Sequence, residues 1–123
     1  MMRPLIALCM LVLFTASCAI WPAPQSPAQA VYMMKASFLV SLRVADDYAA
    51  LPRCPAAPLC SDEKILSAVR ASARATQSAL DTAEAVVTGP AFQSDDTRAK
   101  ALAAAQGALD TFSAITAKLE EKS

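Results

Sequence analysis

The sequence has no histidine and only two glycines among its 123 residues. Histidine is the commonest general base and a frequent metal ligand, so its absence removes the usual centre of acid–base or zinc chemistry. A chain with so few glycines also offers no glycine-rich loop to cradle a phosphate group. We therefore expect a protein that is not an enzyme and that binds no metal or other cofactor.

The charged clusters that remain offer little for catalysis. Two pairs of aspartates are adjacent in the sequence, so the two side chains of each pair diverge on a helix. Two arginines one turn apart could hold an anion, but a solvent-exposed helix face explains them better. These residues are Asp46, Asp47, Asp95, Asp96, Arg70 and Arg74.

The sequence also lacks an excess of charge, because 11 Lys and Arg balance 11 Asp and Glu. A nucleic-acid-binding domain needs a basic surface that displaces counterions from phosphates, so we expect no nucleic-acid partner. Aromatic residues make up only 6% of the chain. The core must therefore come mainly from aliphatic side chains and alanine, and this composition favours helix.

The N-terminus has the pattern of an export signal. Arg3 precedes an uninterrupted apolar run of ten residues, LIALCMLVLF, at positions 5–14. The run has the length of a signal-peptide core and is shorter than the ~20 residues that a membrane-spanning helix needs. We expect export to the periplasm; an uncleaved anchor that extends to Trp21 is the alternative.

Two processing sites are compatible with this signal. The segment TASC resembles a bacterial lipobox, in which Cys18 is lipidated and becomes the N-terminus, although Thr15 stands where the pattern has leucine. The segment AQA, which ends at Ala30, is an ordinary signal-peptidase site and would release a soluble periplasmic or secreted protein. We favour the lipoprotein, because the proline-rich stretch before the domain would then form a tether. The expected divisions are a signal at 1–17, a tether at 18–30 and a folded domain at 31–123.

Cys54 and Cys60 are the only thiols of the predicted domain, with five residues between them in LPRCPAAPLC. Three prolines make this stretch a loop, and two close cysteines of an exported protein usually pair. A zinc site would need further cysteine or histidine ligands, and redox enzymes favour two residues between the cysteines. We predict a structural disulfide, which contributes roughly 2.4 kcal/mol to stability in the chain-entropy model.

Hydrophobic periodicity predicts three helices, at about residues 28–51, 62–87 and 95–122. Pro52 ends the first helix, Ser61 caps the second, Gly89 with Pro90 ends it, and Ser94 or Asp95 caps the third. The core-facing positions are expected to be Val31, Met34, Phe38, Leu42 and Ala45, then Ile65, Val69, Thr76, Leu80, Ala83 and Val87, then Leu102, Ala105, Leu109, Phe112, Thr116 and Leu119. Met33, Val40, Val44 and Leu51 are expected to widen the apolar side of the first helix.

Short connections between these helices favour antiparallel neighbours. The predicted fold class is all-α, an up-down-up three-helix bundle after the signal segment, with one disulfide in the first inter-helix loop. Ala103, Ala104, Gly107 and Ala108 are expected to let a neighbouring helix approach the third helix closely.

The loop carries a resemblance to known sequences. A tyrosine-containing first helix, the motif LP-x-C, an alanine- and proline-rich loop, and LCSD at the start of an alanine-rich second helix follow one another here. In these features the chain resembles small exported proteins, some of them lipoproteins, of proteobacteria and their phages. The resemblance implies a helical bundle with a disulfide loop and brings no assigned activity.

Three functional hypotheses follow. The first is a non-enzymatic envelope protein, tethered to the membrane through the lipid on Cys18, that presents a helical surface to a protein partner. The second is a carrier of a small apolar ligand, lined by Met33, Met34 and the small residues of the third helix. The third is a phage-linked envelope role, such as exclusion or lysis, which rests on the resemblance alone.

Processing at Cys18 is directly testable. We expect the intact mass of the mature protein to correspond to a chain that begins at Cys18 and carries acyl groups, which anchor it because each buried CH₂ contributes ~0.8 kcal/mol to membrane binding. Substitution Cys18→Ser should leave the protein unprocessed. An unmodified N-terminus at Val31, in protein released by osmotic shock, would contradict the lipoprotein interpretation.

Overall fold

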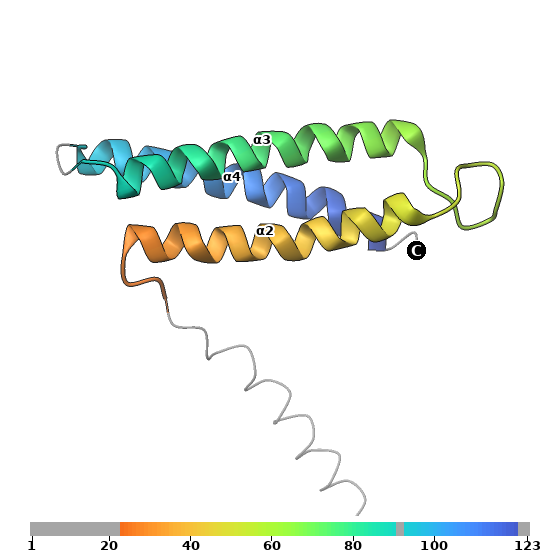
Figure 1. Cartoon of the computed structure of the whole chain (residues 1–123), viewed down its shortest axis with the longest axis horizontal. Coiled ribbons are helices and arrows are strands. Elements are labelled where there is room, and N and C mark those ends of the chain that lie inside the picture. The colour runs from red at the N-terminus through yellow and green to blue at the C-terminus, as the bar shows by residue number, and fades with distance from the viewer. Residues whose placement is uncertain (1–22, 91–92, 121–123) are drawn as a thin grey trace, which may run out of the picture.

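The computed structural model describes residues 23–90 and 93–120, and these form three long helices (Figure 1). The helices are α2 (Pro27–Ala50), α3 (Glu63–Thr88) and α4 (Asp95–Glu120). They run up, down and up, and each packs against the other two. The all-α three-helix bundle predicted from periodicity is confirmed. The predicted signal and Cys18 lie outside the described residues.

Local signals in the sequence explain where α2 begins and ends. Ser26 is its N-cap, and the Ser26 hydroxyl accepts a hydrogen bond from the Gln29 N–H at 3.2 Å. Pro27 suits the first helical position because its fixed φ is helical and its missing N–H has no partner to lose. The helix ends at Ala50, and the backbone of Leu51 is extended, because the residue before Pro52 is disfavoured in the α region.

The N-cap of α3 corrects a prediction. Asp62, and not Ser61, caps this helix, and the Asp62 carboxylate accepts hydrogen bonds from the N–H groups of Lys64 at 2.7 Å and Ile65 at 3.3 Å. Ser61 is buried instead, and its hydroxyl donates to the Leu51 carbonyl at 3.0 Å. Serine and aspartate are both good caps, so the choice between them depends on how the preceding loop turns.

The loop between α2 and α3 is closed by the predicted disulfide. Cys54 and Cys60 are bonded, with their Cα atoms 5.0 Å apart. Two backbone hydrogen bonds join the two ends of the loop: the Ser61 N–H donates to the Pro52 carbonyl at 2.8 Å, and the Cys54 N–H donates to the Ser61 carbonyl at 3.2 Å. The loop is therefore held both covalently and through its backbone.

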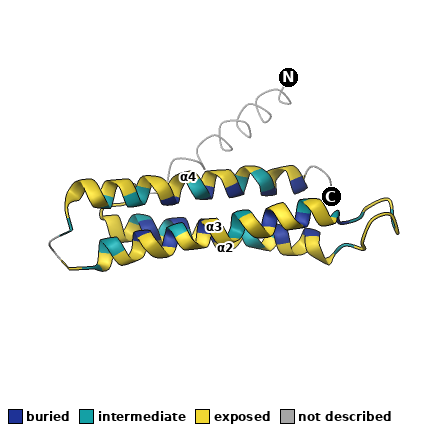
Figure 2. Cartoon of the chain, turned by 90° about the horizontal axis from the view of Figure 1, so that it is seen from above, coloured by how far each residue is buried: buried dark blue, intermediate teal, exposed yellow. Residues whose placement is uncertain are grey.

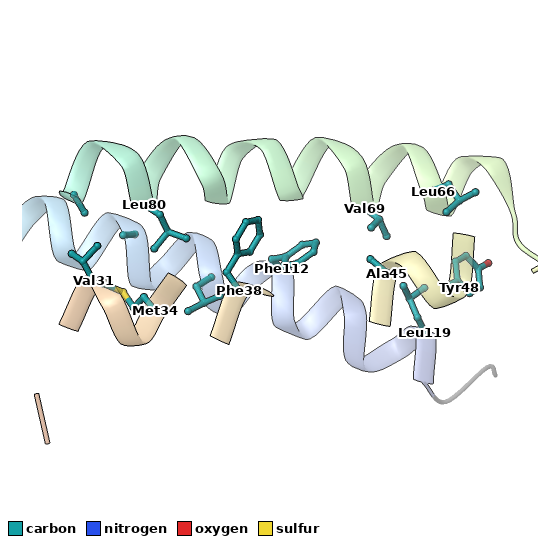
Figure 3. Packing of buried hydrophobic residues seen from close by; sticks show 13 residues of the cluster. Val31, Met34, Phe38, Ala45, Tyr48, Leu66, Val69, Leu80, Phe112 and Leu119 are labelled. Carbon is teal, nitrogen blue, oxygen red and sulfur yellow. The ribbon is translucent and has the colours of Figure 1, made fainter. Parts of the chain in front are cut away.

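Buried positions recur along all three helices (Figure 2), and their side chains pack between the helices as one core (Figure 3). At its centre the rings of Phe38 and Phe112 meet edge to face, with centroids 5.3 Å apart. Thr76 is fully buried, and its hydroxyl lies within hydrogen-bond distance of the carbonyls of Ser72 and Ala108. The buried apolar residues are Val31, Met34, Phe38, Ala45, Tyr48, Leu66, Val69, Leu80, Ala83, Ala105, Leu109, Phe112 and Leu119.

Several core assignments made from the sequence need correction. Leu66 is buried in addition to the predicted Ile65, which is half-buried and packs against the core, because two adjacent apolar residues fit the same helical period equally well. Val40 faces solvent with 65% of its surface exposed. Ala103, Ala104 and Gly107 are exposed, and a Cβ added at Gly107 would meet nothing within 4 Å; the small residue that α4 fully buries is Ala105 instead.

We expect Cys54→Ser to lower the free energy of unfolding by about 1–3 kcal/mol without changing the fold, because the loop then loses its covalent closure. Chemical denaturation followed by circular dichroism measures this change. Equal denaturation midpoints for the oxidised and the reduced wild-type protein would show that the disulfide contributes nothing.

Candidate functional site

One surface of the bundle differs from the others, and we call it the α2 outer face. It comprises exposed residues at near-heptad spacing along the solvent side of α2, and its apolar members precede its charged members. Large hydrophobic side chains at Tyr32, Leu39 and Val40 are 75%, 61% and 65% exposed. The complete set is Tyr32, Ala36, Leu39, Val40, Arg43, Asp46 and Asp47.

The other two helices have no comparable surface. Within the residues that the structure describes, no large hydrophobic side chain of α3 or α4 is exposed, and the one further example is Leu59 in the disulfide loop, at 42%. The solvent side of α3 carries the polar stripe of Glu63, Ser67, Arg70, Arg74, Gln77, Asp81 and Glu84. The apolar surface is therefore concentrated on α2.

The charges of the α2 outer face are free of partners in the described part of the chain. Arg43, Asp46 and Asp47 make no ion pair and no side-chain hydrogen bond there. Lys35, at the edge of the same helix, lies 3.3 Å from Asp81 and 2.5 Å from Glu84 of α3. The hydrogen bond to Glu84 raises the pKa of Lys35 above its ordinary value, although partial burial opposes the shift. Lys35 thus fastens α2 to α3, whereas the charges on the outer face remain available to a partner.

Most of the remaining charged residues that the sequence singled out make ion pairs. Arg70 contacts Glu63 at 3.3 Å, and Glu63 also pairs with Arg53 of the loop, whereas Arg74 has no ion pair in the described part of the chain. The aspartates at the start of α4 pair within the helix: Asp95 with Arg98 at 3.4 Å and Asp96 with Lys100 at 2.7 Å.

Two grooves border α2. The larger, of about 490 Å³, lies between α2 and α4 and brings together Met33, Met34 and Ala103, as the ligand-carrier hypothesis requires; Ala104, Gly107 and Ala108 are not part of it. A smaller groove of about 230 Å³ lies between α2 and α3 and is bordered by Leu39 of the outer face.

The two tyrosines of α2 have different environments. Tyr48 is buried, and its hydroxyl accepts a hydrogen bond from the Asp62 N–H at 3.0 Å, which joins the end of α2 to the start of α3. Tyr32 belongs to the α2 outer face.

No metal or membrane-spanning element is found in the described segments. Residues 23–90 and 93–120 contain no group of three His, Cys, Asp or Glu residues that could hold a metal ion. None of their helices is long and apolar enough to cross a bilayer.

Comparison with known proteins returns no family model, no curated protein and no solved structure that matches the chain. The resemblance to exported proteins of proteobacteria and their phages is therefore a hypothesis, and the candidate site depends on the geometry of the chain itself.

The role of Tyr48 is testable against a matched control. We expect Tyr48→Phe to lower the free energy of unfolding by about 1 kcal/mol, because the Asp62 N–H loses its acceptor at a half-buried position. The same change at Tyr32, whose side chain is exposed, should leave the stability unchanged. Equal denaturation midpoints for the two variants would contradict a structural role of the Tyr48 hydroxyl.

Proposed function

We propose that the protein is a non-enzymatic interaction module of the bacterial cell envelope, tethered to a membrane by lipid on Cys18, that presents the α2 outer face to a protein partner. One observation carries this proposal: the large hydrophobic side chains that the helices leave exposed all lie on α2. Contiguous exposed apolar surface on a small domain is typical of an interaction site.

The chemistry of the α2 outer face fits a protein partner. Its first part is apolar with one aromatic residue, Tyr32, and its second part is charged with one arginine, Arg43. Tyrosine and arginine are the side chains most enriched among the residues that contribute strongly to protein–protein binding. Fully burying a leucine or valine side chain contributes about 1.5–3 kcal/mol, so a partner that covers Leu39 and Val40 gains several kcal/mol.

The start of α2 supports processing at Cys18 over cleavage after Ala30. Val31 is buried, with 2% of its surface exposed. Cleavage after Ala30 would remove the Ser26 cap and the first turn of α2 and would place a charged amino group on Val31. A chain that begins at Cys18 keeps the cap, the first turn and a short tether. The Cys54–Cys60 disulfide agrees with an oxidising compartment such as the periplasm.

A second candidate function is favoured by the groove between α2 and α4. Its lining of Met33, Met34, Leu102 and Ala103 could hold a small apolar ligand. A ligand retained in the native mass spectrum of protein from its own host would favour this candidate. The phage-linked role has no structural observation in its favour.

Site-specific photo-cross-linking in the native envelope tests the main proposal. A benzophenone-bearing amino acid in place of Val40 should give a cross-linked product, because Val40 is 65% exposed and lies where the apolar part of the α2 outer face meets its charged part. The same amino acid in place of Ala104, an exposed residue of α4, serves as the matched control and should give none. Absence of any product from Val40, in cells that contain the folded and processed protein, would contradict the proposal.

A further inference from the structure

On the α2 outer face the positive charge and the negative charges lie at different levels of the helix. Arg43 comes one helical turn before the adjacent Asp46 and Asp47, and none of the three has an ion-pair partner in the described part of the chain. Pairing of α2 with an identical helix in the parallel direction would place like charges opposite one another. Antiparallel pairing about a two-fold axis at the level of residues 44–45 places Arg43 of each copy opposite the aspartates of the other.

The same register also covers the apolar residues. An antiparallel pair centred there places Leu39 and Val40 beside the end of α2 in the second copy, near Ala50 and Leu51. The disulfide loop projects beyond the end of α2 (Figure 1), so the loop of the second copy extends along the start of the α2 outer face. That loop carries Leu59, the fourth exposed large hydrophobic residue of the described chain. In this register Leu59 of one copy lies at the same end of the pair as Tyr32 of the other.

We propose that the partner of the α2 outer face is a second copy of this chain, bound antiparallel through Leu39 and Val40 and through two reciprocal contacts of Arg43 with Asp46 and Asp47. This inference rests on the proposed function of the α2 outer face as a contact surface. A two-fold interface uses the same surface twice, and only a self-complementary surface satisfies both its charge and its apolar contacts in one register. Attachment of both copies to one membrane would raise their effective concentration and favour the pair.

The inference is tested with two full-length copies that carry different C-terminal tags and are co-expressed in the native envelope. After mild detergent solubilisation, purification through one tag should recover the other copy, and less of it at high salt because the charged contacts are exposed. The acidic variant Arg43→Asp and the basic variant Asp46→Lys/Asp47→Lys should each recover at least about tenfold less of an identical copy, because like charges then face one another.

Co-expression of the acidic variant with the basic variant should restore recovery, because opposite charges face each other again. The matched control Arg74→Asp makes the same charge change at an exposed position of α3 and should recover its copy as the wild type does. All substituted residues are exposed, and circular dichroism confirms that each variant is folded.

Two outcomes would overturn the homodimer. In the first, purification of the tagged wild-type protein recovers no second copy. In the second, the acidic variant and the basic variant each recover as much of an identical copy as the wild type does. If Val40 then cross-links to a different protein, the proposed function stands and only the identity of the partner is wrong. If Val40 cross-links to nothing, both proposals fail.

Discussion

The edge-to-face contact between Phe38 of α2 and Phe112 of α4 sets the orientation of α2. The same core buries two further large side chains of α2, Met34 and Tyr48. Once Phe38 points inward, helical geometry directs Tyr32, Leu39 and Arg43 away from the core. The exposed apolar surface is thus a direct consequence of how the core is filled.

The connection between α2 and α3 holds this orientation at one end of the bundle. The disulfide, the buried Ser61 and the hydrogen bond from Asp62 to Tyr48 fix the last turn of α2 against the first turn of α3. The proposed contact surface needs no moving part, because the side chains that would meet a partner lie on a helix whose inner side is packed along its length. The proposed homodimer uses the same loop a second time, as a surface against the start of α2 in the other copy.

The sequence was sufficient for the helices and the loop, and insufficient for the site. Pro52, Gly89 with Pro90, and Ser94 act within one or two residues of the chain, so they predicted the helix ends closely and the cysteine spacing predicted the disulfide. The site depends instead on which apolar side of α2 faces inward. Apolar residues cover more of the circumference of α2 than two neighbouring helices can bury, and periodicity alone placed Val40 among the packed residues. This excess of apolar residues around α2 was the sequence signal for an exposed apolar surface.

The most direct test of the account is the native size of the protein in its detergent-solubilised envelope. We predict that the wild-type protein migrates as a complex larger than one chain, and that the triple variant Tyr32→Ser/Leu39→Ser/Val40→Ser migrates as a folded, processed single chain. Serines at Ala68, Ala71 and Ala75, which are exposed on α3, form the matched control and should leave the complex intact. A wild-type protein that migrates as a single chain, or a triple variant that keeps the size of the wild-type complex, would contradict the assignment of the α2 outer face as the contact surface.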